Sequence, residues 1–242
     1  EPSGPLGFVD LQSGFWQTGL THSTSSGWSD IVGVPGTLSR CTHHVKSYSK
    51  MPLRIRAFYI LHTDVENTWS NAGVVALHGV KGVAVKNCTF EHLGLTGVLA
   101  DAGSQGVNVT DSTFIDTSGS AISIGNVTEA MLTPATQDSD FRISNNFIRD
   151  TGAEYHGCAG IVAGYVVRAA IEHNNIANTS NGAICLGWGW GAKNTMHSNK
   201  VNYNKITRSN TELFDCGSIY TLSMQPGSEV AYNYIQNQVL LF

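Results

Sequence analysis

The chain has 242 residues, of which 26 are glycine, 13% are charged and 41% are hydrophobic. Average soluble domains carry about 25% charged residues and about 7% glycine, so this chain is poor in charge and rich in turn formers. Its net charge is −4 with only 14 lysines and arginines, which argues against a nucleic-acid-binding surface. No run reaches the roughly 18 consecutive apolar residues of a membrane span. What remains is a β-rich protein with many turns.

Residues 1–54 show no repeat and are rich in Gly, Ser, Pro and Trp. We expect them to form an irregular first coil or a cap, because the ends of a solenoid need covering. From residue 55 onward a six-residue template recurs, consisting of a β-branched residue, four variable positions and then Phe or Ile. Successive copies are 24, 34, 28, 30 and 29 residues apart, and a weaker copy spans Ile55 to Ile60. The clear copies are Val85–Phe90, Val109–Phe114, Ile143–Ile148, Ile171–Ile176, Val201–Ile206 and Val230–Ile235.

A second signal follows the same spacing. The fourth template position holds Cys88, Ser112 and then four asparagines, and each unit also contains a short alternating run. The asparagines are Asn146, Asn174, Asn204 and Asn233, and the runs start at Val98, Ile122, Ile161, Ile184 and Ile219. Units of about 30 residues with period-two runs predict coils that stack to bury their apolar side.

The fold predicted from this pattern is all-β, a right-handed parallel β-helix of about seven coils over residues 55–242. A β-sandwich or barrel is the alternative, but it gives no reason for one residue type to recur at one point of every unit. The chain ends at Gln238–Phe242 within a coil. We therefore expect that edge to meet either another chain or the remainder of a longer solenoid.

Two units have an extra five residues before the third strand, and both expansions carry carboxylates. Glu154 and Glu212 lie at the same offset, and Asp215 follows in the second expansion. The two expansions flank a shorter turn, so their walls should be two coils apart, about 9.6 Å. Inverting glycosidases hold their carboxyl groups roughly 6.5–9.5 Å apart, which suits an acid and a base. The alternative is that these are ordinary solvated turn residues.

Residues that suit a sugar surround these carboxylates in the sequence. Aromatic rings stack on pyranose faces and histidines exchange hydrogen bonds near neutral pH, although the same residues can simply pack or lie in turns. The predicted substrate-binding residues are Trp188, Trp190, Tyr155, His156, Tyr220 and His92. Asp138 and Asp140 offer a weak calcium site, and no other cofactor is expected.

Five cysteines occur without the spacing of a zinc site, so at least one is free or bonded to another chain. Four sequons suggest a glycoprotein outside the cell or on its surface. They lie at Asn87, Asn108, Asn126 and Asn178.

Several segments resemble a known family. They are Glu91–Gly97, Gly152–Tyr155, Gly160–Tyr165, Ile171–Asn174, Leu186–Gly191 and Leu213–Leu222. In these segments the chain resembles right-handed β-helix proteins related to glycoside hydrolase family 141. The resemblance implies a secreted or surface carbohydrate-active protein that acts on complex plant or algal-type glycans, with acidic residues of adjacent coils doing the chemistry.

Three functions are carried forward. The first is a glycoside hydrolase, with Asp215 and Glu154 as the acid and base and Glu212 nearby. The second is a non-catalytic glycan-binding or structural module of an extracellular assembly. The third is a polysaccharide lyase, for which the expansions offer Arg149 and Arg208 as basic residues.

Overall fold

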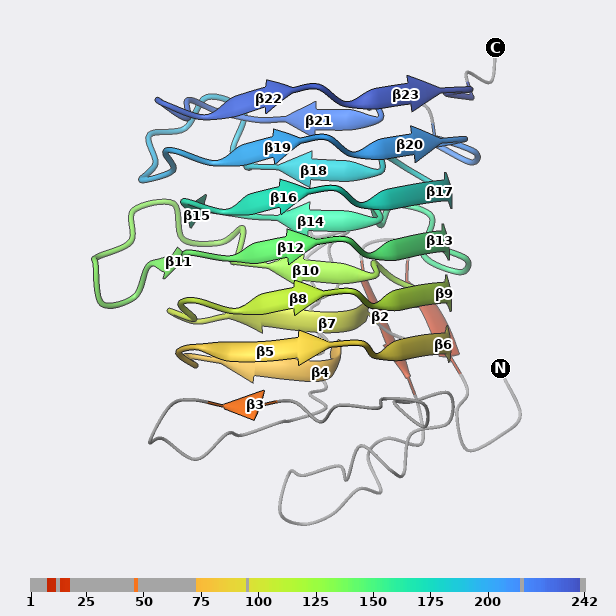
Figure 1. The fold of residues 1–242 in the computed structure, drawn as a ribbon, viewed down its shortest axis with the longest axis horizontal. Coiled ribbons are helices and arrows are strands. Elements are labelled where there is room, and N and C mark those ends of the chain that lie inside the picture. Colours follow the sequence, from red (N-terminus) through yellow and green to blue (C-terminus); the bar gives the residue numbers. More distant parts are fainter. Residues whose placement is uncertain are drawn as a thin grey trace.

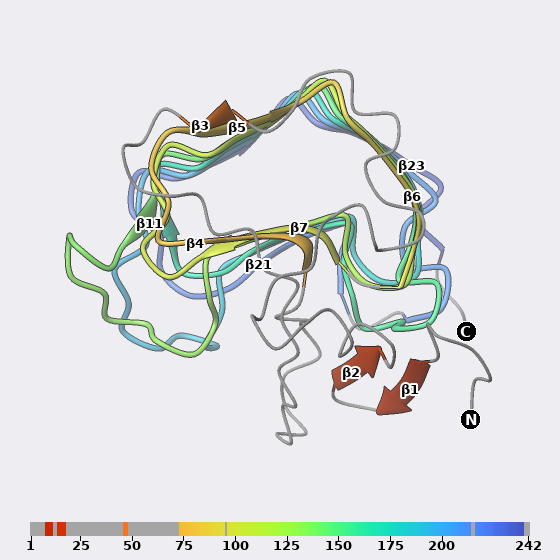
Figure 2. The ribbon, with the colours of Figure 1, turned by 90° about the horizontal axis from the view of Figure 1, so that it is seen from below.

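The computed structural model describes residues 8–11, 14–17, 46–47, 73–94, 96–213 and 216–239. The regular elements in these ranges are β-strands, and no helix among them is long and apolar enough to cross a membrane. The strands wind into six stacked coils, each contributing one strand to each of three sheets (Figures 1 and 2). The predicted all-β solenoid is therefore confirmed.

Three long sheets, which we call sheets I, II and III, form the sides of the solenoid. Sheet I consists of β4 (Gly73–His78), β7 (Thr96–Asp101), β10 (Ile122–Ile124), β14 (Ile161–Ala163), β18 (Ile184–Leu186) and β21 (Ile219–Thr221). Sheet II consists of β3 (Lys46–Ser47), β5 (Val83–Lys86), β8 (Asn108–Thr110), β12 (Arg142–Ser144), β16 (Ala170–Glu172), β19 (Lys200–Asn202) and β22 (Glu229–Ala231). Sheet III consists of β6 (Thr89–Leu93), β9 (Thr113–Thr117), β13 (Phe147–Thr151), β17 (Asn175–Thr179), β20 (Lys205–Thr207) and β23 (Tyr234–Gln236).

Neighbouring strands within these sheets are parallel, except that β3 runs antiparallel to β5. A short parallel pair, β11 (Asp138–Ser139) with β15 (Val166–Val167), lies between sheets I and II. At the N-terminal end, β1 (Phe8–Leu11) and β2 (Gly14–Gln17) form an antiparallel hairpin. Most of the predicted cap, and the weak copy at Ile55–Ile60, lie outside the described residues.

The strand register confirms the predicted interior columns. The column in sheet II is Val85, Val109, Ile143, Ile171, Val201 and Val230. The column in sheet III is Phe90, Phe114, Ile148, Ile176, Ile206 and Ile235. Members in the first five coils are buried, and the rings of Phe90 and Phe114 stack with centroids 4.5 Å apart. In the sixth coil Val230 and Ile235 are 48% and 46% exposed, because no described coil lies over them.

The turn between sheets II and III is the same in each of the six coils that the structure describes, and we call it the asparagine turn. Its first residue has a positive φ between 54° and 59°. That residue is Asn or Asp, which tolerate this conformation better than most residues, in three of the six described coils, and His or Tyr in the other three. The next position carries the predicted asparagine ladder. Asn174 Oδ1 accepts from the backbone N and the Nδ2 of Asn146, at 3.1 and 3.0 Å, and Asn174 Nδ2 donates to Asn204 Oδ1 at 3.0 Å. Each buried amide is thereby satisfied by the neighbouring coil.

The corner where sheet III leads into sheet I needs small residues. A Cβ on Gly97 would lie 2.7 Å from the Ala121 carbonyl oxygen and 2.9 Å from the Phe114 ring. A Cβ on Gly160 would lie 2.8 Å from the Ala183 carbonyl oxygen. The coils therefore approach too closely at this corner for a larger side chain, which accounts for part of the high glycine content.

Candidate functional site

Sheet I lies between two sets of long connections (Figure 2). Residues 152–160 and 209–218 enter it from sheet III, and we call them the expanded turns. Residues 125–141 and 187–199 leave it toward sheet II. In the coil between, both connections are short. Long loops on both edges of one sheet make that sheet the natural place for a ligand site, because loops carry the variable chemistry of a repeat fold.

The two expanded turns begin with the same backbone conformation. The amide before Glu154 donates to the Thr117 carbonyl oxygen at 3.1 Å, and the amide before Glu212 donates to the Thr179 carbonyl oxygen at 3.1 Å. Thr117 and Thr179 belong to one column of sheet III. Glu154 and Glu212 therefore occupy equivalent positions two coils apart, as their sequence offset predicts.

The short turn between the expansions forms hydrogen bonds with both of them. Ser180 Oγ donates to the His156 carbonyl oxygen at 3.0 Å, and Asn181 Nδ2 donates to the Gly157 carbonyl oxygen at 3.0 Å. On the other side, the Glu212 amide donates to the Ser180 carbonyl oxygen at 3.0 Å. The three turns thus form one continuous surface, with the short turn as its floor.

The predicted carboxylates on this surface face solvent. Glu154, Glu212 and His156 are exposed. Neither glutamate side chain has a hydrogen bond or ion pair within the part of the chain that the structure describes. Asp215, the third predicted catalytic residue, lies outside the described residues.

Three cysteines of the described residues that form no disulfide gather beside the expanded turns, a feature that the sequence pattern did not predict. They are Cys158, Cys185 and Cys216, whereas Cys88 is disulfide-bonded. Cys216 Sγ donates to Asn181 Oδ1 at 2.6 Å. A hydrogen bond with Cys216 and complete burial raise the pKa of the Cys185 thiol well above its ordinary value. The Cys185 thiol therefore stays protonated at neutral pH.

Aromatic rings lie on the outer face of sheet I and on its far edge. Tyr220 is half-buried in the outward column next to Cys185, and Trp188 packs with it over the same apolar cluster. Trp190 contacts Trp188 edge to face, with centroids 4.8 Å apart, and is 68% exposed. These three predicted residues share one face of the molecule.

Residues 55–201 match the family model described as "Right handed beta helix region". The chain belongs to the right-handed β-helix family. This β-helix is also similar to a solved structure named "Glycoside hydrolase", with 30% sequence identity and a TM-score of 0.66. The similarity covers 69% of this chain and 30% of that one, so the β-helix spans less than a third of that protein's length. No curated protein matches the chain.

Two predicted substrate-binding residues, Tyr155 and His92, lie away from the aromatic face of sheet I. Tyr155 is only 7% exposed and belongs to the interior apolar core, where its ring cannot stack on a sugar without unfolding the turn. This corrects its prediction as a substrate-binding residue. His92 is exposed but lies in the first coil, where its Nδ1 pairs with Asp116 Oδ2 at 2.7 Å. Sequence periodicity does not reveal which way a turn residue points.

The two acids proposed for calcium point to different partners. Asp138 is buried, and its Oδ1 accepts from the backbone amides of Gly103 and Ser104 at 2.9 and 2.8 Å. Asp140 forms a bidentate ion pair with Arg168. Among the residues that the structure describes, no group of three or more His, Cys, Asp or Glu is placed to hold a metal ion.

The four sequons differ in how their side chains are used. Asn87 is exposed. Asn126 Oδ1 accepts from the Glu129 amide at 2.9 Å, and Asn178 Nδ2 donates to an Asp150 carboxylate oxygen. Asn108 Nδ2 donates to the Gly106 carbonyl oxygen at 3.4 Å. Glycosylation at the four sequons stays a prediction.

Proposed function

We propose that this β-helix is an extracellular or cell-surface glycoside hydrolase that cleaves a complex glycan across sheet I, beside the expanded turns. The observation that carries the proposal is the pair of equivalent carboxylates, Glu154 and Glu212, on expanded turns two coils apart. Its 30% identity to a structure named "Glycoside hydrolase" supports the same chemistry.

Coil spacing sets the separation of the two turns at about 9.6 Å, close to the roughly 6.5–9.5 Å of inverting enzymes. In that reaction one carboxylic acid protonates the glycosidic oxygen of the leaving group. The other carboxylate takes a proton from a water molecule, which attacks the anomeric carbon from the opposite face. We assign these roles to Asp215 and Glu154, with Glu212 as a further carboxylate three residues before Asp215 in the sequence.

The aromatic residues on the outer face of sheet I then hold the sugar chain. Trp190 and Tyr220 present apolar ring faces with polar edges, the surface that pyranose rings stack on. His156 lies on the expanded turn beside Glu154 and has an exposed imidazole for sugar hydroxyls. The glycan would run along the outer face of sheet I, past both expanded turns.

Hydrolysis of plant and algal polysaccharides by the full chain tests the proposal, with new reducing ends as the readout. We expect Asp215→Asn and Glu154→Gln each to lower kcat at least about 100-fold, the usual contribution of a general acid or base. Glu172→Gln on β16 removes the same kind of charge from sheet II and serves as the control. NMR of the first product should show inversion. Full activity of both variants would refute the assignment.

A non-catalytic glycan-binding module is the second candidate, and one observation favours it. The side chains of Glu154 and Glu212 have no positioning partner among the described residues, whereas catalytic carboxylates are usually oriented by neighbours. Binding of a polysaccharide without any product would establish this function instead. An unsaturated sugar among the products would indicate a lyase, although Arg149, one of its two candidate bases, donates to Asp150 at 2.7 Å.

A further inference from the structure

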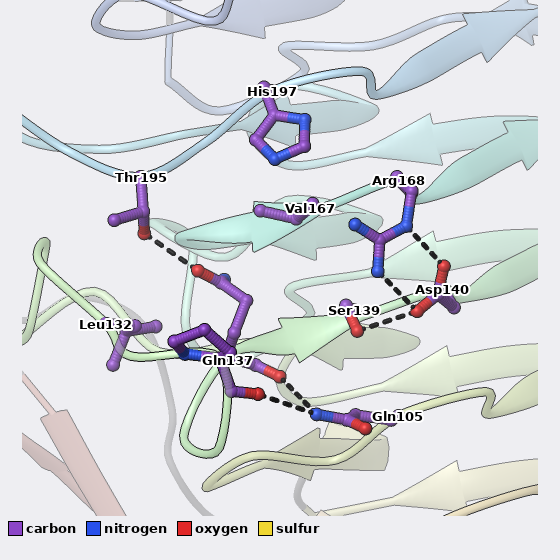
Figure 3. Close-up of a pocket in the computed structure, with 10 residues that line it drawn as sticks. Gln105, Leu132, Gln137, Ser139, Asp140, Val167, Arg168, Thr195 and His197 are labelled. Atoms are coloured by element: carbon purple, nitrogen blue, oxygen red, sulfur yellow. Dashed lines mark hydrogen bonds and ion pairs between the residues drawn. The ribbon is translucent and has the colours of Figure 1, made fainter.

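A cavity lies beside the 125–141 connection, and we call it the side pocket (Figure 3). It has a volume of about 450 Å³, within the roughly 300–1,000 Å³ of small-molecule sites. Leu132 of the insertion lines it and also packs in a cluster with Trp188. The 125–141 connection thus separates the side pocket from the proposed cleavage surface.

The rear wall of the side pocket is a ladder of residues from successive coils. Gln105, Ser139, Val167 and His197 pair in parallel, one from each of four coils. All four line the cavity. A wall built on paired strands holds its side chains at fixed spacing, as a preorganised binding site requires.

A bidentate ion pair forms one side of the side pocket. Arg168 Nε and Nη2 donate to the two carboxylate oxygens of Asp140 at 2.6 and 2.7 Å, and Ser139 Oγ donates to the same carboxylate at 2.8 Å. The hydrogen bond from Arg168 lowers the pKa of Asp140, so the pair stays charged. Arg168 Nη1 has no partner within the described part of the chain. A ligand can therefore accept from this guanidinium nitrogen and donate to the neighbouring Asp140 carboxylate.

On the opposite side of the side pocket, the side-chain amides of Gln105 and Gln137 hold the 125–141 connection in place. Gln105 Nε2 donates to the Pro134 and Gln137 carbonyl oxygens at 3.2 and 3.3 Å, which leaves its Oε1 as an acceptor. Gln137 is buried and fully used, since it donates to the Tyr165 carbonyl oxygen and accepts from Thr195 Oγ1 at 2.8 Å. The insertion is therefore fastened in place around the cavity.

We propose that the side pocket is a second saccharide site, which binds one or two neutral sugar residues of the same glycan away from the point of cleavage. A vicinal diol matches the Asp140–Arg168 pair, because one hydroxyl donates to the carboxylate while its neighbour accepts from the guanidinium. Leu132, Pro134 and Val167 supply apolar surface for the C–H face of the ring. Since Asp140 already neutralises Arg168, an anionic sugar gains little here. The proposal rests on the proposed glycan substrate.

Titration of the full chain with neutral methyl glycosides, followed by NMR, tests this site directly. We expect shifts at the Gln105 side-chain amide and the His197 ring, and loss of those shifts in Arg168→Ala. Gln105→Leu keeps the side-chain size and should weaken binding about 10-fold, through the loss of the hydrogen bond that a sugar hydroxyl donates to Gln105 Oε1. Arg142→Ala removes an exposed arginine of the neighbouring coil that does not line the pocket, and this variant should bind as the wild type does.

Affinity for the intact polysaccharide is then compared in the Glu154→Gln background, where substrate would not be consumed. Arg168→Ala should lower it and Arg142→Ala should not. Unchanged binding in Arg168→Ala and Gln105→Leu, or shifts with uronates alone, would overturn the proposal. Because this readout is binding, the side pocket can be confirmed even if the chain cleaves nothing, and refuted even if it does.

Discussion

The asparagine turn and the two edges of sheet I differ in how much they vary along the solenoid. The asparagine turn keeps one conformation in all six described coils. At sheet I, residues 152–160 form a long connection, whereas the next coil crosses with residues 180–183. A corner whose buried amides must match those of its neighbours cannot change alone. At the edges of sheet I some side chains also bond between coils, as Asn199 Oδ1 does with the Ala169 amide at 3.0 Å, but the connections there differ in length from coil to coil. All the proposed ligand contacts lie at these edges.

The largest expected effect comes from breaking the uniform corner. Asn174→Ala removes a side chain that bonds Asn146, Asn204 and the Ile143 carbonyl oxygen. Several buried polar groups would then lose their partners, at about 1–3 kcal/mol each. We expect the free energy of unfolding to fall by about 4 kcal/mol in chemical denaturation.

Asn175→Ala provides the matched control, because Asn175 is adjacent in sequence and only half-buried on β17. We expect it to change the free energy of unfolding by no more than about 0.5 kcal/mol. If both variants lost the same stability, the asparagine ladder would not be the element that holds the coils in register.

The next largest effect is a gain in stability, and it comes from Asp138 in the 125–141 connection. Burial, and to a lesser extent the charge of Asp101, raises the pKa of Asp138 to about 7. Hydrogen bonds from the Ser104 and Gly103 amides lower this pKa but do not outweigh the burial. The unfolded chain would release this proton near its ordinary value of 3.8. The folded state therefore binds the proton more tightly, and stability falls as the pH rises from about 4 to about 7.

Asp138→Asn keeps an acceptor for both amides and removes the buried charge. We expect it to match the wild type near pH 4 and to be about 2 kcal/mol more stable at pH 8, by denaturation at several pH values. Glu129→Gln removes an exposed carboxylate from the same 125–141 connection and serves as the control. A variant that is less stable than the wild type at pH 8 would contradict this account.

The smallest effect is expected on the outside of the asparagine turn. Lys86 Nζ lies 3.4 Å from Asp111 Oδ2, with the two side chains 57% and 32% exposed. Such pairs contribute at most about 0.5 kcal/mol because water and salt screen them. We expect Lys86→Met to leave the thermal midpoint nearly unchanged at low and high salt. A drop of several degrees would mean that the surface, and not the ladder, stabilises this corner.

The interior of the solenoid could be predicted from the sequence because its constraint is local and repeated. One β-branched residue and one Asn per coil, at steps of 24–34 residues, were enough to assign two columns and the ladder. The equivalence of Glu154 and Glu212 followed from the same count. These positions share a backbone conformation, so sequence offset translates directly into position in space.

The side-chain arrangement of the candidate site could not be predicted, because it depends on the direction in which each turn residue points. Tyr155 turns inward from an expanded turn, and Cys185 and Cys216 meet although no spacing relates them. The side pocket did leave a signal. Gln105, Ser139 and Val167 are separated by the template's own steps of 34 and 28 residues, so projecting the repeat onto every position would have found that wall.

The ladder and the sheets share one further property, the direction of their hydrogen bonds. These bonds run between coils, parallel to the solenoid axis (Figure 1). A force that pulls the two ends apart along that axis would load one coil boundary at a time, because each coil contacts only its neighbours. Each released coil of about 30 residues would add roughly 100 Å of extended chain. Under tension the protein would unzip in regular steps, with one coil as the unit.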